Sequence, residues 1–420
     1  MKSQSPEAGF AAEPDSSTPP RATAPDRLGG GLLIMLALLS ALAPFAIDLY
    51  LPAFPEMVGS LGTTATGVQL TLTAFLLGLA LGQLVFGPLS DRIGRRLPLI
   101  IGALLCVLAS ALAALSPNVE VLIAARVIQG LTGAAGMVIG RAIIADLAVG
   151  AAAARGLNLM MIVGGIAPVI GPVAGSLLVG PLGWRGLLWV VAGLAVLMLL
   201  AVIFGVPESH GAAKRRALIA GRHLTGSPYR ALVSRSYLGY TLVFALSFAA
   251  FMGYIAASPF IYQTMMGFGP VAYGLSFAAN AAGIAVFSGV SARLTATRSV
   301  RSLLGVGLVM ILIGGLAVLL IALTGVPPIT LLLPLFIMVA GMGFIFGNAT
   351  ALALDAAPGA SGTGSAILGF LQYVLGALVS GLVGLAGETS ALPLGLVMFA
   401  SAVLAVAAFL LAGPRRTPAR

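Results

Sequence analysis

Apolar residues run through most of this chain in long blocks, and short polar segments separate one block from the next. Each block holds about 20 residues, the length that an α-helix needs to cross the hydrocarbon core of a bilayer. The pattern therefore predicts an all-α membrane protein with twelve membrane-spanning helices. The predicted spans cover residues 30–52, 67–88, 98–116, 119–142, 157–180, 186–207, 237–260, 271–294, 301–323, 328–352, 361–386 and 391–412.

The composition and the placement of charge agree with this pattern. Of the 420 residues, 59% are hydrophobic and 8% are charged, whereas soluble domains carry about 25% charged residues. Nineteen of the 22 lysines and arginines fall in the tails or in the second, fourth, sixth and eighth connections. Positive loops stay in the cytoplasm, so we expect both termini there. The basic residues form short clusters with few aromatics between them, which favours a lipid bilayer over a nucleic acid as partner.

A polar stretch at 208–236 divides the predicted spans into two sets of six. The segment VFGPLSDR at Val85–Arg92 returns as VFSGVSAR at Val286–Arg293, at the end of the second span in each set. Duplicated halves are common among membrane transporters. We therefore expect two six-helix bundles. The predicted parts are a disordered cytoplasmic tail at 1–27, bundles at 28–207 and 237–412, a cytoplasmic central loop at 208–236 and a tail at 413–420.

Asp48 is the charged residue that the first predicted span contains. A carboxylate within a membrane costs several kcal/mol unless it is paired, wet or protonated. Pro44, Pro52 and Pro55 bracket it and indicate a bent, packed helix. We expect Asp48 to face an internal cavity and to exchange a proton. A position at the level of the lipid headgroups is the alternative.

The polar segment GPLSDRIGRR at Gly87–Arg96 resembles the signature loop of the major facilitator superfamily. The matching residues are Gly87, Asp91, Arg92, Gly94, Arg95 and Arg96. Its place between the second and third of twelve spans fits that superfamily as well. The resemblance implies the major facilitator fold and a role for this loop in conformational gating. The alternative is a set of basic anchors at the cytoplasmic surface.

Two further segments resemble motifs of the same superfamily. LIAARVIQGLTG in the fourth span contains Arg126, which in similar drug–proton antiporters takes part in proton relay. The alternative is that Arg126 reaches the outer surface along its own aliphatic stem. APVIGPVAGS at 167–176 resembles the antiporter motif of the fifth span, through Gly171, Pro172 and Gly175. Small residues and a proline there permit close helix contact and a bend.

The chain as a whole is most similar to the drug-resistance branch typified by bicyclomycin-resistance exporters (Bcr/CflA). The segments that carry this resemblance are DLYLP at 48–52, GRAIIAD at 140–146, GWR at 183–185, SPFIYQ at 258–263 and FAAN at 277–280. The fourth span ends in Arg141 and Asp146, whose charges can reach the loop after the second span at the cytoplasmic face. The resemblance implies a charge lock of Asp91, Arg95 and Asp146, with Asp91 near the start of the eleventh span at Ser361–Gly364. Surface ion pairs of little energetic weight are the alternative.

The second half lacks the acid of the signature loop, because Ala292 stands where Asp91 stands in the first half. Neutral polar and aromatic residues within its spans are the candidate substrate contacts, together with Asp48. They are Tyr254, Gln263, Asn280, Asn348, Gln372 and Tyr373. Each could instead be a packing residue.

Several other kinds of chemistry are disfavoured. The chain has no phosphate-binding GxxxxGK[ST] loop, and its lysines are Lys2 and Lys214. His210 and His223 are expected to be solvated residues of the central loop, too sparse for a metal or catalytic site. The single Cys106 excludes an internal disulfide. We expect no enzyme activity and no cofactor, with a proton gradient as the energy source.

These features together predict a secondary active transporter in the bacterial inner membrane, working as a monomer. It would exchange protons for a small, largely apolar drug by alternating access, with Asp48 and Arg126 as the proton-coupling residues. A proton-coupled importer of a small metabolite is the first alternative. A non-transporting sensor and a membrane enzyme are the others.

Overall fold

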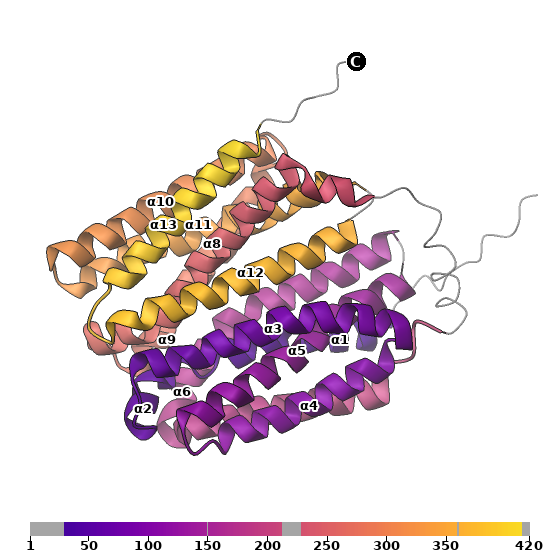
Figure 1. Ribbon diagram of the computed structural model, residues 1–420, viewed down its shortest axis with the longest axis horizontal. Coiled ribbons are helices and arrows are strands. Elements are labelled where there is room, and N and C mark those ends of the chain that lie inside the picture. The colour runs from indigo at the N-terminus through magenta and orange to yellow at the C-terminus, as the bar shows by residue number, and fades with distance from the viewer. Residues whose placement is uncertain (1–28, 149, 212–227, 359–360, 414–420) are drawn as a thin grey trace, which may run out of the picture.

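The computed structural model describes residues 29–148, 150–211, 228–358 and 361–413, and in these ranges it is helical without any β-strand. The helices form two groups that lie side by side, the N-terminal half (indigo to magenta) and the C-terminal half (rose red through orange to yellow) in Figure 1. The long helices of the N-terminal half are α1 (Gly30–Asp48), α3 (Ala65–Ile93), α4 (Arg96–Ala114), α5 (Val119–Leu147) and α6 (Gly150–Gly205). Those of the C-terminal half are α8 (Arg235–Pro259), α9 (Pro270–Leu294), α10 (Val300–Thr324), α11 (Leu332–Asp355), α12 (Ser361–Val383) and α13 (Leu392–Leu411).

Six short elements complete the described chain. They are η1 (Leu51–Ala53), α2 (Phe54–Ser60), η2 (Pro228–Val233), the π-helical η3 (Phe260–Met265), η4 (Pro328–Leu331) and η5 (Gly384–Ala386). The all-helical prediction is confirmed, and eleven helices among the described residues are long and apolar enough to cross a membrane. The fifth of these holds the predicted spans 157–180 and 186–207, with Gly183 between them in a non-helical conformation (φ 64°, ψ 178°).

Helix ends follow local sequence signals. Four helices have an N-cap residue whose side-chain oxygen accepts a backbone N–H of the first turn. These caps are Thr64, Asn118, Ser234 and Ser299. Gly94 ends α3 at a φ of 104°, a conformation that favours glycine, and so turns the chain into α4.

Helix α1 ends at Asp48, four residues earlier than predicted. Pro52 has no N–H to donate to the carbonyl of Asp48, so the helical ladder cannot continue through it. The short elements η1 and α2 follow instead. The helix end therefore falls at the one carboxylate of this segment.

Helices α3 and α5 cross at glycines. A Cβ added to Gly130 would lie 2.0 Å from the carbonyl oxygen of Phe75, and one added to Gly78 would lie 2.2 Å from that of Val127. Such contacts let two backbones approach more closely than larger residues permit. The crossing places Arg126, one turn before Gly130, beside α3.

Three hydrogen bonds join the two halves at one end of the molecule. We call the end that carries the exposed Arg92, Arg96, Arg235, Arg293 and Arg298 the basic end, and the opposite end the α2 end. At the α2 end, Gln263 Nε2 donates to the Pro52 carbonyl (3.0 Å), Gln69 Nε2 to the Ala256 carbonyl (3.0 Å) and Thr66 Oγ1 to the Gly384 carbonyl (2.6 Å). The halves are thus bonded together at this end, with α12 packed along α3 (Figure 1).

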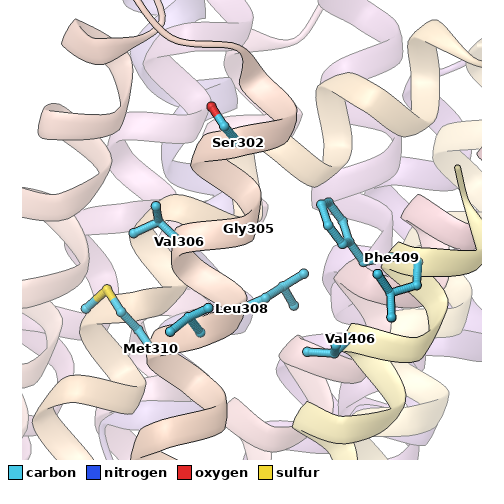
Figure 2. A pocket seen from close by; sticks show the side chains of 9 residues that line it. Ser302, Gly305, Val306, Leu308, Met310, Val406 and Phe409 are labelled. Atoms are coloured by element: carbon cyan, nitrogen blue, oxygen red, sulfur yellow. The ribbon is translucent and has the colours of Figure 1, made fainter. Parts of the chain in front are cut away.

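An apolar groove lies on the outside of the C-terminal half, between α10 and α13 (Figure 2). Gly305, Val306 and Met310 line it from α10, and Val406 and Phe409 from α13. Both helices pack against other helices of the same half. The groove therefore belongs to the lipid-facing surface, where large apolar side chains are expected to be exposed.

We expect Gly130→Ala to destabilise the protein, because the new Cβ would overlap the Phe75 carbonyl. Overpacking of this kind lowers the free energy of unfolding by about 1–3 kcal/mol. Thermal unfolding in detergent measures the effect. Gly133→Ala is the matched control, since a Cβ there has no neighbour within 4 Å, and an equal loss in both variants would contradict the packing argument.

Candidate functional site

Asp48 lies inside the protein at the end of α1, with 2% of its surface exposed. Its Oδ1 has no hydrogen-bond partner. A Cβ added to Gly171 of α6 would lie 2.9 Å from the Asp48 Cβ, and one added to Gly175 would lie 1.9 Å from the Leu49 carbonyl oxygen. The end of α1 therefore rests on the glycines of the antiporter-like segment, and Asp48 is enclosed by protein.

The same segment of α6 also reaches the other half. A Cβ added to Gly274 of α9 would lie 2.3 Å from Ser176 Oγ and 3.0 Å from the Pro172 carbonyl oxygen. Asp48 thus lies where α1, α6 and α9 come together.

Arg126 is fully buried, so the alternative of an outward-reaching side chain is wrong. Its Nη1 donates to Gln129 Oε1 (2.6 Å) and its Nη2 to the Ala46 carbonyl (2.9 Å). The guanidinium also lies over two rings, 4.5 Å from the centroid of Tyr50 and 4.2 Å from that of Phe75. Because Ala46 lies in the last turn of α1, Arg126 binds the negative end of that helix dipole rather than the Asp48 carboxylate.

A chain of polar groups continues behind Arg126. Gln129 Nε2 donates to Ser110 Oγ (2.7 Å), which donates to the Cys106 carbonyl (2.7 Å). Cys106 is buried, and its thiol lies 4.0 Å from the Gln129 carbonyl oxygen. These bonds fix the amide that in turn holds the guanidinium.

In the C-terminal half, Asn280 joins two tyrosines. Its Nδ2 donates to the hydroxyls of Tyr254 (2.7 Å) and Tyr262 (3.0 Å). Tyr273 shares a hydrogen bond with Ser258 (3.2 Å). All of these side chains are buried. The structure therefore brings the predicted residues Tyr254 and Asn280 together and adds Tyr262 and Tyr273, which sequence reasoning missed.

The other predicted substrate contacts are dispersed. Gln263 bonds the opposite half at the α2 end, and Asn348 bonds Ser291 Oγ (2.8 Å) and the Phe344 carbonyl within its own half. Tyr373 packs edge-on against Phe248 at 5.5 Å, and its hydroxyl lies 4.0 Å from Met137 Sδ across the interface. Gln372 is half-buried.

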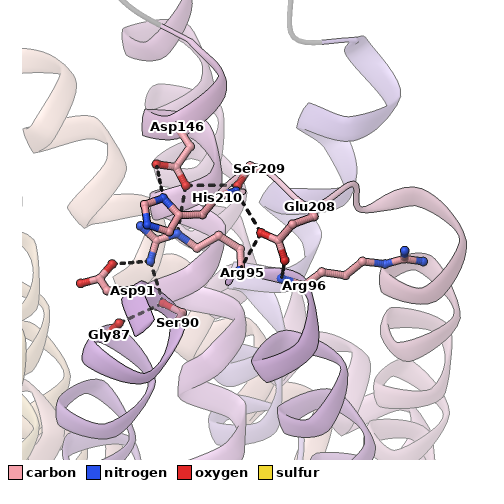
Figure 3. A network of polar contacts seen from close by, with 9 residues as sticks. All are labelled: Gly87, Ser90, Asp91, Arg95, Arg96, Asp146, Glu208, Ser209 and His210. Carbon is pink, nitrogen blue, oxygen red and sulfur yellow. Dashed lines mark hydrogen bonds and ion pairs between the residues drawn. The ribbon is translucent and has the colours of Figure 1, made fainter. Parts of the chain in front are cut away.

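The signature loop forms a compact polar network at the basic end (Figure 3). Arg95 is buried; its Nη1 binds Asp91 and Ser90, and its Nε donates to Asp146 Oδ2 (2.9 Å). Burial opposes the charge of Arg95, but the hydrogen bonds and charges of Asp146 and Asp91 raise its pKa further above the usual value. Arg92 is exposed, and Arg141 takes no part in this network; its Nε donates to the Met137 carbonyl (3.0 Å) instead.

Residues just after α6 close the network. Glu208 accepts the backbone N–H groups of Arg95 (2.9 Å), Arg96 (3.2 Å) and His210 (2.9 Å), and so caps the first turn of α4. Ser209 Oγ donates to Asp146 Oδ2 (3.1 Å), and His210 Nδ1 lies 3.9 Å from Asp146 Oδ1. His210 is 1% exposed. The expectation of a solvated His210 is therefore wrong, because Glu208 pulls this segment against α4; His223 lies outside the described residues.

Comparison with known proteins places the chain in a family. A sequence profile described as "Major Facilitator Superfamily" matches residues 36–381, most of both halves. The chain belongs to the Major Facilitator Superfamily. It is 35% identical over 384 residues to an uncharacterised MFS-type transporter of Bacillus subtilis, across 90% of this chain and 94% of the relative.

A second relative bears on the branch of the superfamily. The chain is 27% identical over 385 residues to a protein of Haemophilus influenzae named a bicyclomycin resistance protein homolog, across 90% of this chain and 94% of the relative. The resemblance to the drug-resistance branch is thereby confirmed. The crystal structure of a D-xylose–proton symporter has the same fold, with a TM-score of 0.71, 16% identity and coverage of 89% of this chain and 96% of that one.

We expect Arg95→Ala to destabilise the protein, because Asp91 and Asp146 would lose the cation that both of them bind. Removing one partner of a largely buried ion pair costs about 3–5 kcal/mol, so the melting temperature in detergent should fall by several degrees. Arg92→Ala is the control, because Arg92 is exposed three residues away. Equal melting temperatures for wild type and Arg95→Ala would show that the network adds no stability.

Proposed function

We propose that this chain is a proton-driven exporter of small drug molecules in the bacterial inner membrane. Membership of the superfamily and the drug-resistance relative support transport of such compounds. The observation that carries the proposal is Asp48, a buried carboxylate with an unbonded oxygen at the junction of α1, α6 and α9. Burial in that position disfavours the charged carboxylate and favours its neutral, protonated form.

The topology we propose has twelve spans. A straight helix of 56 residues, the length of α6, would be about 84 Å long, far more than the roughly 30 Å of a hydrocarbon core. Gly183 lies between the two apolar parts of α6, so α6 supplies two spans that meet at the α2 end. An even number of spans puts both termini on the side of the basic end, which is the cytoplasmic side by its positive charge.

The arrangement of the halves supports an inward-open state. Hydrogen bonds from Gln263, Gln69 and Thr66 join the halves at the α2 end, which is the outer end in this topology. Arg141, on α5 toward the basic end, is exposed, and so is Asp91 of the signature loop. The exposed charged side chains at this end support an opening toward the cytoplasmic side.

Proton exchange at Asp48 can bias the two halves because the α6 segment beneath it contacts both. Gly171 touches Asp48, and Pro172 and Ser176 touch Gly274 of α9. A charged Asp48 favours a conformation that admits water, whereas a neutral Asp48 tolerates full closure. Proton entry from outside and drug binding from inside would then favour opposite states, which is the requirement for exchange.

The signature-loop network would act as the cytoplasmic gate. It ties the ends of α3, α4 and α5 to the segment after α6, so that the N-terminal half moves as a unit. The Asp91 side chain is 59% exposed here, as expected while the basic end is open. Closure would bring Asp91 toward the start of α12, where a helix N-terminus attracts a carboxylate.

We expect Asp48→Asn to abolish drug transport driven by a pH gradient, because an amide cannot release a proton. Uptake of a fluorescent substrate into inverted membrane vesicles, with and without a gradient, measures this. Substrates come from a growth panel of antibiotics against cells with and without the protein, which also establishes the direction of transport. Glu120→Gln is the control, since Glu120 is an exposed acid at the α2 end of α5. Gradient-driven uptake by Asp48→Asn at the wild-type rate would overturn the proposed coupling.

A further inference from the structure

The apolar groove between α10 and α13 arises because these two helices diverge toward the basic end. A Cβ added to Gly315 of α10 would lie 3.1 Å from the backbone nitrogen of Phe399 in α13, so the backbones touch there. A Cβ added to Gly305, ten residues nearer the basic end, would lie 3.9 Å from the Phe409 ring, an ordinary contact distance. The separation leaves a groove of about 530 Å³ (Figure 2).

The groove runs along the helices and is apolar over most of its length. From Ser302 to Met310, α10 rises by about 12 Å, most of the roughly 15 Å of hydrocarbon in one leaflet of a bilayer. The groove therefore has the direction and depth of an acyl chain in the leaflet at the basic end. Its apolar lining consists of Val306, Leu308, Val309, Met310, Val406, Phe409 and Leu410.

Arg301 lies at the basic end of this groove. Its guanidinium is 4.1 Å from the centroid of the Phe409 ring, which lines the groove. Its Nη1 donates to the Tyr240 hydroxyl and the Gly413 carbonyl (2.6 Å each), and its Nη2 donates to the Phe409 carbonyl (3.1 Å). These acceptors are neutral and use three of the five N–H donors of a guanidinium. Arg301 therefore keeps its positive charge and has donors left for a ligand.

Neighbouring groups strengthen the positive field at this end. Arg298 is exposed and lies four residues before Ser302, whose exposed side chain lines the groove. The ion pairs within the described part of the chain join groups of the N-terminal half, so none of them neutralises Arg298 or Arg301. Asp355, at the end of α11, is the acid that the described C-terminal half carries at this end. The arginines of the same end outnumber it.

An apolar groove with a cationic end matches one component of a membrane. The phosphate of a phospholipid accepts hydrogen bonds from guanidinium and hydroxyl groups, and its acyl chain fills an apolar groove of one leaflet's depth. A zwitterionic lipid adds an ammonium group, which the arginines repel. A lipid with net negative charge therefore complements this groove best.

We propose that the groove is a binding site for an anionic phospholipid. One acyl chain lies between α10 and α13, and Arg298, Arg301 and Ser302 hold the phosphate. In the topology proposed above, the site opens to the cytoplasmic leaflet, where basic residues near the membrane surface attract anionic lipids. The lipid would fill the space where α10 and α13 separate, and so join the start of one helix to the end of the other.

Two lipids with identical chains test the charge preference. Purified full-length protein in detergent is titrated in parallel with dioleoyl phosphatidylglycerol and dioleoyl phosphatidylcholine, and native mass spectrometry gives the affinity for the first bound lipid. We expect phosphatidylglycerol to bind about tenfold more tightly, because its phosphate bonds the arginines without an opposing ammonium. Equal affinities would indicate ordinary boundary lipid and would overturn the inference. The assay contains no gradient and no drug, so either result leaves the export proposal standing.

A pair of arginine variants locates the head group. In Arg298→Gln we expect the preference for phosphatidylglycerol to fall about fivefold, the effect of one basic residue near a lipid surface. Arg293→Gln is the control, since Arg293 is an exposed arginine at the end of α9, a helix that packs on α6 and α11. An unchanged preference in Arg298→Gln, or an equal fall in both variants, would contradict the assigned position of the phosphate.

A pair of glycine variants locates the acyl chain. Gly305→Leu places a side chain in the groove, where the backbone leaves room for a Cβ, and we expect it to weaken the binding of both lipids about tenfold. Gly193→Leu is the control, because Gly193 is an exposed glycine of α6 with no neighbour within 4 Å of an added Cβ. Melting temperatures in lipid-free detergent verify that both variants fold. Undiminished binding to folded Gly305→Leu, or equal losses in the two variants, would exclude the groove as the site.

Discussion

The bond between Arg126 and the Ala46 carbonyl is the interaction on which the rest of this molecule depends. Pro52 stops α1 at Asp48 and leaves carbonyl oxygens of the last turn without N–H partners. Arg126 supplies one of those donors from α5, and the rings of Tyr50 and Phe75 cover the guanidinium. A broken helix inside a membrane is tolerated only when its free backbone groups find partners within the protein. The arginine thus makes the break possible, and the break sets the position of the carboxylate.

The two ends of the molecule are held by different forces. At the α2 end, neutral amide and hydroxyl groups of one half bond backbone carbonyls of the other, and such bonds are individually modest. At the basic end, ionised groups bond one another within a single half. Weak contacts between rigid bodies and strong contacts inside each body are what a rocking motion requires.

Periodicity and composition were sufficient to predict the helices, since a membrane leaves few other structures for the backbone. The special status of Asp48 and Arg126 was also predictable, because charge in an apolar block needs a partner or a function. Tyr262 and Tyr273 were missed because they acquire meaning only when η3 and α9 bring them to Asn280 and Ser258. Tyr273 and Asn280 are two turns apart on one helix face. That spacing could have indicated that both side chains point toward the same neighbours.

The burial of Ser209 and His210 was likewise beyond the sequence pattern. A polar segment after a span is typical of a solvated loop. Here the segment after α6 folds back because Glu208 accepts the free backbone N–H groups at the start of α4. For Arg141 the sequence suggested a contact that the structure does not contain. It was grouped with Asp146 by proximity in sequence, but five residues along a helix turn the side chain to a different face.

The position of the single cysteine has a practical result for following this protein at work. Cys106 lies behind Ser110 and Gln129, 4% exposed, so thiol-reactive dyes and spin labels in the aqueous phase have no native sulfhydryl within easy reach. Reporter cysteines can therefore be placed in pairs, one on each half, in the otherwise unaltered sequence. Opening and closing of either face can then be timed without first engineering a cysteine-free background.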